Sequence, residues 1–150
     1  MTEAINRYQT AKGYFQSCRM IECSPERNTE ARRMLTILSM MMLTGFSLEL
    51  YFKAWLLARG TTSERVRRYS HGICNLYRDC EATGLVVHQL DQLVDAVAVQ
   101  HQDFTYRYIG ADAEIPLLNW NTTFQILDAL DTRVDEAVGA SALYGLQPGH

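Results

Sequence analysis

The chain has 150 residues, of which 47% are hydrophobic and 21% are charged, and its formal net charge is −3. A chain of this size buries enough apolar surface for one globular domain, so we expect a single domain over residues 1–150. Its core is predicted to span about 3–139, followed by a tail at 140–150. The small net charge provides no general attraction for nucleic acid or anionic membranes, so any phosphate binding must come from a local cluster of cations.

The segments that could indicate a cellular location contain no targeting signal. The longest uncharged stretch, from Met34 to Leu48, is shorter than the roughly 20 residues that a helix needs to cross a bilayer. The N-terminal residues alternate charged and apolar side chains and lack the apolar core of a signal peptide. The four cysteines form no C-x-x-C pair, which is typical of reduced thiols. We therefore expect a cytoplasmic protein with no membrane span.

Helical periodicity organises the first 60 residues into two helices. A first helix is predicted from about Glu3 to Glu22, with an inward stripe of Ala4, Tyr8, Ala11, Phe15 and Cys18. Ser24 and Pro25 resemble a helix start, so a second helix is predicted from there to Gly60, on the order of 50 Å long. One apolar face of this helix is expected to contain Leu35, Leu38, Met42, Phe46, Glu49, Phe52 and Leu56. Residues 46–60 are apolar around almost the whole circumference, which predicts an interior helix.

The rest of the chain predicts shorter helices joined by turns. Thr61 and Glu64 have capping-box spacing, which predicts a helical turn through Arg68. Ser70 is expected to cap a third helix that ends at Gly84.

A fourth helix is predicted from about Val86 to Tyr108, followed by a loop over residues 110–119. Asn119 or Asn121 is expected to cap a fifth helix ending at Gly139. No strand pattern competes with these helices. The sequence therefore predicts an all-α, up-and-down bundle of about five helices around one long central helix.

Three features of these helices occur together in a known family. The long helix contains Glu49-Leu50-Tyr51-Phe52-Lys53-Ala54, the next helix begins with His71-Gly72-Ile73, and Tyr106-Arg107-Tyr108 follows later. This combination resembles the HEPN family, which has Glu-x-x-x-Lys-Ala on its second helix, a His-Asp-Leu signature on the next, and an Arg-Tyr step. The chain departs from that pattern at Gly72.

The resemblance implies a HEPN-like bundle that forms a homodimer and works in prokaryotic toxin–antitoxin or defence systems, often beside a nucleotidyltransferase. It also implies the chemistry to look for, because many HEPN proteins are metal-independent endoribonucleases. Their active site is an arginine followed after four to six residues by a histidine, with two copies meeting across the dimer.

Two arginine–histidine combinations are candidate catalytic pairs. Arg65 and His71 have the family spacing, but they lie before the third helix instead of on a later one. Arg107 lies at the family position, but no histidine follows it, and His101 precedes it by six residues. Imidazole suits metal-free RNA cleavage because it can both take and return a proton near neutral pH. The alternative for each histidine is a structural role, at a helix start for His71 and in the core for His101.

Glu49 and Lys53 form a second candidate feature, because an i,i+4 spacing lets the two charges meet on one helix face. Two interpretations remain open. The pair either fixes helix packing, with Lys53 also reaching a helix-end carbonyl, or lets Glu49 orient Arg107 or a histidine in a shared polar pocket.

Candidate RNA-binding residues lie near the turn after the long helix and before the loop. They are Arg67, Arg68, Tyr69 and Tyr106, whose cations could contact phosphates and whose rings could stack on bases. No Glu-x-x-His, paired zinc-ligand or phosphate-loop motif occurs, so the sequence predicts neither a metal site nor a cofactor.

The missing histidine after Arg107 decides the functional prediction. We expect a HEPN-like regulatory or scaffold protein that binds an RNA or protein partner, such as an antitoxin or a nucleotidyltransferase, without efficient catalysis. The alternative is a metal-independent endoribonuclease with a composite site at a homodimer interface. Whether the protein is an enzyme stays open at this point.

Overall fold

The computed structural model describes residues 2–140, and every regular element in that part of the chain is helical. The all-α prediction is therefore confirmed. In chain order the elements are α1 (Glu3–Cys23), the 3₁₀ helix η1 (Pro25–Asn28), α2 (Glu30–Ala58), α3 (Ser63–Arg68), α4 (Ile73–Ala82), α5 (Leu90–Gln102) and α6 (Trp120–Val138).

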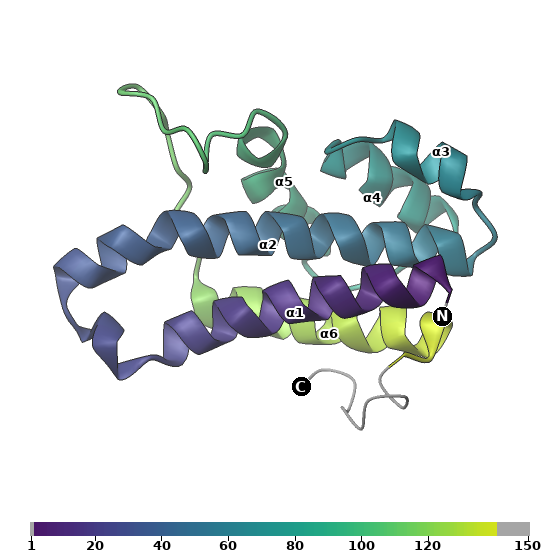
Figure 1. The fold of residues 1–150 in the computed structure, drawn as a ribbon, viewed down its shortest axis with the longest axis horizontal. Helices are drawn as coiled ribbons and strands as arrows, with labels where there is room; N and C mark the ends of the chain where they lie inside the picture. The colour runs from purple at the N-terminus through teal and green to yellow at the C-terminus, as the bar shows by residue number, and fades with distance from the viewer. Residues whose placement is uncertain (1, 141–150) are drawn as a thin grey trace.

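Helix α2 is the centre of the bundle. Figure 1 shows α1 and α6 along one side of α2, and α3, α4 and α5 on the other side. All ten residues from Ser47 to Leu56 are buried, including the large side chains of Tyr51, Phe52 and Trp55. The prediction that this apolar segment is an interior helix is confirmed.

The length and composition of α2 would also suit a membrane span. Its most apolar window has a mean hydropathy of 1.5, and 56% of that window is buried against the rest of the bundle. A core helix and a membrane span meet this criterion equally. The expectation of a cytoplasmic protein without a span therefore stays a prediction.

The start of α2 differs from the predicted unbroken helix from Ser24 to Gly60. The Ser24 hydroxyl caps only the short η1 turn, and Thr29 is extended, with its hydroxyl accepting a hydrogen bond from the amide of Arg32 at 3.4 Å. The break reverses the chain so that α1 and α2 can pack antiparallel. Leu35, which was predicted on one apolar face of this helix, is 78% exposed, because this end of the hairpin extends beyond α6 (Figure 1).

Three further boundaries differ from prediction by a few residues. Thr62, not Thr61, caps α3 by accepting from the amide of Arg65 at 3.3 Å. Ser70 does not cap α4, because it has a φ of 49° and α4 begins only after Gly72. Helix α5 is shorter than residues 86–108, since Gln89 at its start and Phe104 after its end both have positive φ.

The predicted boundaries of the last helix agree more closely with the structure. The side chain of Asn119 caps α6 by accepting from the amide of Thr122 at 3.1 Å, and Gly139 ends the helix with a φ of 68°. The connection between α5 and α6 forms a loop, as predicted. Of the expected tail at 140–150, residues 141–150 lie outside the described part of the chain.

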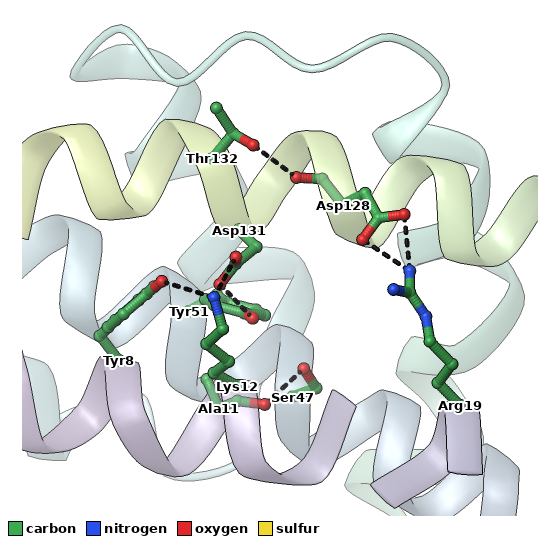
Figure 2. Close-up of polar contacts among 9 residues, drawn as sticks. All are labelled: Tyr8, Ala11, Lys12, Arg19, Ser47, Tyr51, Asp128, Asp131 and Thr132. Carbon is green, nitrogen blue, oxygen red and sulfur yellow. Dashed lines mark hydrogen bonds and ion pairs between the residues drawn. The ribbon is translucent and has the colours of Figure 1, made fainter. Parts of the chain in front are cut away.

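A buried ionic cluster joins α1, α2 and α6 (Figure 2). The ammonium of Lys12 donates to Asp131 at 2.9 Å and to the hydroxyl of Tyr8 at 3.4 Å, and the hydroxyl of Tyr51 donates to Asp131 at 2.7 Å. Burial and the charge of Asp131 raise the pKa of Tyr51 well above its ordinary value. This cluster, which was not predicted, fixes the register of the three helices.

Candidate functional site

On the other side of α2, one carboxylate collects two imidazoles from distant parts of the chain. The Oε2 atom of Glu49 lies 2.7 Å from Nε2 of His101 and 3.0 Å from Nδ1 of His71. Glu49 comes from the middle of α2, His71 from the turn before α4, and His101 from the last turn of α5. An ionised carboxylate can only accept hydrogen bonds, so each ring has a hydrogen on the nitrogen facing Glu49.

Lys53 completes this cluster from one turn further along α2. Its ammonium donates to Oε1 of Glu49 at 2.6 Å and to the carbonyl oxygen of Ser70 at 2.8 Å. The predicted i,i+4 ion pair and the predicted contact of Lys53 with a carbonyl beyond a helix end are both present. The left-handed backbone of Ser70 lies directly before His71, so this contact also holds the turn that carries the imidazole.

The surroundings of Glu49 keep its carboxylate charged. Burial alone would raise its pKa, but the hydrogen bonds from His101, Lys53 and His71 outweigh that effect and lower the pKa to about 2. Glu49 is therefore an anion at neutral pH.

A glycine inside α2 makes room for His101. A Cβ atom added at Gly45 would lie only 2.5 Å from Nδ1 of His101, so any larger residue would meet the ring. Glycine in a helix interior costs roughly 1 kcal/mol relative to alanine. At this position the absence of a side chain allows α5 to approach α2 and bring His101 to Glu49.

Aromatic rings connect the two histidines to Arg107. The ring of Phe46 packs edge-on against His101, and Phe104 packs edge-on against His71, with centroid distances of 4.8 and 5.0 Å. The guanidinium carbon of Arg107 lies 5.0 Å from the centroids of both phenylalanine rings. His71 and Arg107 thus lie against the same Phe104 ring, and no more than twice that distance separates them.

The residues in and around the Glu49 cluster differ in their exposure to solvent. His101 is only 3% exposed and Glu49 is buried, whereas the side chain of His71 is 36% exposed and Arg107 lies on the surface. Beside His101 there is a cavity of only about 10 Å³, which is about the space of one water molecule. Substrate-sized molecules can therefore reach the outer edge of His71 and the guanidinium of Arg107, but not His101.

The predicted pairing of Arg65 with His71 is not formed. Arg65 donates instead to Asp79 on α4 at 3.3 Å, and the hydroxyl of Tyr69 also donates to Asp79. His71 turns the other way, toward Glu49. The structure therefore replaces the expected Arg65–His71 pair with contacts of His71 and His101 to Glu49, and Arg107 packs against the neighbouring phenylalanine rings.

The candidate RNA-binding residues separate into two groups. Arg67 and Arg68 are exposed on α3, next to the half-buried Tyr69, and Arg68 forms a surface ion pair with Glu64 at 2.5 Å. Tyr106 was proposed to stack on bases, but it is only 6% exposed and lines the small cavity beside His101. Burial raises the pKa of Tyr106 to about 12. Its ring is packed inside the bundle and cannot serve as a base platform.

The residues that the site needs beyond those predicted are Gly45, Phe46 and Phe104. Only Gly45 gave a usable signal in the sequence, as a glycine within an otherwise unbroken helical segment.

The HEPN resemblance remains a prediction: in comparisons with known proteins, no family model, no curated protein and no solved structure matches this chain.

Proposed function

We propose that this chain is a HEPN-like regulatory or scaffold protein of a prokaryotic defence or toxin–antitoxin system, which binds an RNA or protein partner without efficient catalysis. The prokaryotic system comes from the sequence resemblance. The lack of efficient catalysis rests on one observation, which is that His101 is enclosed beside Glu49 while only His71 reaches the surface.

Metal-free RNA cleavage needs a base for the 2′-hydroxyl proton and an acid for the leaving oxygen. Within the cluster around Glu49, only the imidazole of His71 is accessible for these two tasks. The inward nitrogens of both rings are also occupied by the same oxygen of Glu49. A cluster of this kind holds α2, α4 and α5 together and presents His71 and Arg107 as a recognition surface.

A second candidate function has its own supporting observation. His71 and Arg107 lie against the same Phe104 ring, so a partly exposed imidazole and a surface cation share one aromatic neighbour. A homodimer that brought two such surfaces together would contain two imidazoles and two guanidinium groups. That arrangement would serve a metal-independent endoribonuclease, and Arg107 with His71 would be its catalytic pair.

One assay separates the two functions. Purified protein is incubated with single-stranded RNA in EDTA, and binding and cleavage are followed together by native and denaturing gels. The scaffold proposal predicts intact RNA at every protein concentration, whether or not a complex forms. Cleavage that is lost in His71→Ala and Arg107→Ala but retained in the exposed control variants His88→Ala and Arg65→Ala would favour the endoribonuclease.

The predicted homodimer is tested independently by sedimentation velocity at micromolar concentration. A monomer would remove the basis of the second candidate, because the cluster around Glu49 in one protomer has only one accessible imidazole, His71.

A further inference from the structure

We propose that Glu49, His71 and His101 form a binding site for one zinc-class divalent cation, with two imidazole nitrogens and one carboxylate oxygen as ligands. The three ligand atoms all lie within 4.8 Å of one another. This inference goes beyond the proposed function and does not depend on it. The sequence predicted no metal site because the three ligands come from segments 22 and 30 residues apart, not from a short motif.

The set of donor atoms selects the class of cation. Two histidines and one glutamate are a common protein ligand set for Zn²⁺, with water in the fourth position of a tetrahedron. Mg²⁺ and Ca²⁺ prefer shells made almost entirely of oxygen, and this cluster offers only one carboxylate. We therefore expect Zn²⁺ and Co²⁺ to bind, and Mg²⁺ not to compete.

Binding of an ion requires the ligand atoms to change their separations. The N···O distances of 2.7 and 3.0 Å are hydrogen-bond distances, whereas ligands about 2.1 Å from a tetrahedral ion are separated by roughly 3.4 Å. Each ring would also move its hydrogen to its other nitrogen, so that the nitrogen facing Glu49 offers a lone pair. A neutral imidazole stays neutral in this exchange.

Lys53 limits the affinity without blocking the site. Its ammonium donates to Oε1 of Glu49, while both imidazoles face Oε2, so the ligand oxygen is the one that Lys53 leaves accessible. The nearby positive charge repels a dication, which weakens binding. The same contact fixes the orientation of the carboxylate, as partners of metal ligands commonly do. The half-exposed His71 provides the path from solvent.

Titration with Co²⁺ tests the site on the full chain in the absence of RNA. We expect one equivalent of Co²⁺ to give the strong visible absorption of a tetrahedral site, and Zn²⁺ but not Mg²⁺ to abolish it. His71→Gln and His101→Gln should each weaken binding by at least about tenfold. His88→Gln, which changes an exposed histidine outside the cluster, should leave binding unchanged. Retention of wild-type affinity in His71→Gln would overturn the proposal.

The exposed thiol of Cys74, three residues after His71, is the main competing ligand. X-ray absorption of the zinc-loaded wild-type protein settles this without a variant that has to fold. Only nitrogen and oxygen neighbours near 2.0–2.1 Å support the proposed site. A sulfur neighbour near 2.3 Å, or loss of binding in Cys74→Ser, would assign the ion to the thiol and refute the inference.

Discussion

The contact between Gly45 and His101 leads to a prediction in which the same chemical change has opposite effects at two positions. Gly45 and Gly13 are both helical glycines, in α2 and α1. A methyl group at Gly13 would meet no atom within 4 Å, whereas at Gly45 it would lie 2.5 Å from His101 Nδ1. Gly13→Ala is therefore a matched control for Gly45→Ala.

The expected changes in the free energy of unfolding have opposite signs. Alanine is favoured over glycine in a helix interior by roughly 1 kcal/mol, so Gly13→Ala should stabilise the protein by about that amount. Gly45→Ala gains the same term but forces the His101 ring away from its 2.7 Å contact with Glu49. A lost hydrogen bond to a charged group costs about 1.5–3 kcal/mol, and overpacking adds about 1–3 kcal/mol. The net expectation is a destabilisation of about 1.5–5 kcal/mol.

Urea unfolding followed by circular dichroism measures both free energies, and thermal unfolding should shift by about 2–4 °C for each kcal/mol. Gly45→Ala should also weaken Co²⁺ binding, because His101 is displaced, whereas Gly13→Ala should not. If Gly45→Ala stabilised the protein as much as Gly13→Ala does, the close approach of α5 to α2 would be wrong, and with it the position of His101.

Three further predictions concern buried polar groups. Glu49→Gln should lower the free energy of unfolding in urea by about 3–5 kcal/mol, because the buried ammonium of Lys53 loses its counterion. The same change in a Lys53→Met background should lower it by less. Equal losses in the two backgrounds would contradict the pairing. Asp131→Asn should lower the free energy of unfolding by a similar amount, because it removes the negative charge 2.9 Å from the buried Lys12. A change below about 1 kcal/mol would show that this ion pair contributes little to stability. Burial raises the pKa of Cys18 from 9.0 to about 11, because the folded state favours the thiol over the thiolate. The free energy of unfolding should therefore be unaffected by this group below pH 9 and should fall by about 2–3 kcal/mol as the pH rises to 11. Cys18→Ala should remove that part of the alkaline loss, and an unchanged pH dependence would refute the assignment.

The sequence predicted the helices better than their ends. Apolar periodicity identified the interior helix and the Asn119 and Gly139 boundaries of α6, because these depend on local patterns. The starts of α2, α3 and α4 were wrong by a few residues because each has two candidate start positions: Ser24 or Thr29, Thr61 or Thr62, and Ser70 or Gly72. Tertiary contacts decide between them, as when the carbonyl of Ser70 accepts from Lys53.

The sequence identified several residues of the candidate site but not how they are arranged in space. Glu49 and Lys53 were paired correctly because i,i+4 spacing fixes their separation. His71 and His101 were both singled out, but the sequence could not show that the same carboxylate binds them. The Lys12–Asp131 pair was missed, although each charge interrupts an apolar stripe on its own helix, which is a usable signal for a buried ion pair.

The two buried clusters on α2 differ in a way that separates structural from functional use of charge. Tyr51 and Glu49 are two residues apart, so their side chains leave the helix about 200° from one another. The Tyr51 side leads to Lys12 and Asp131, which are both almost fully buried and whose charges compensate each other between helices. The Glu49 side ends in the half-exposed His71, with Arg107 on the surface beyond it. Stabilising helix packing requires only the closed kind of cluster, so the opening at His71 is the feature that makes the Glu49 cluster the place to look for a ligand.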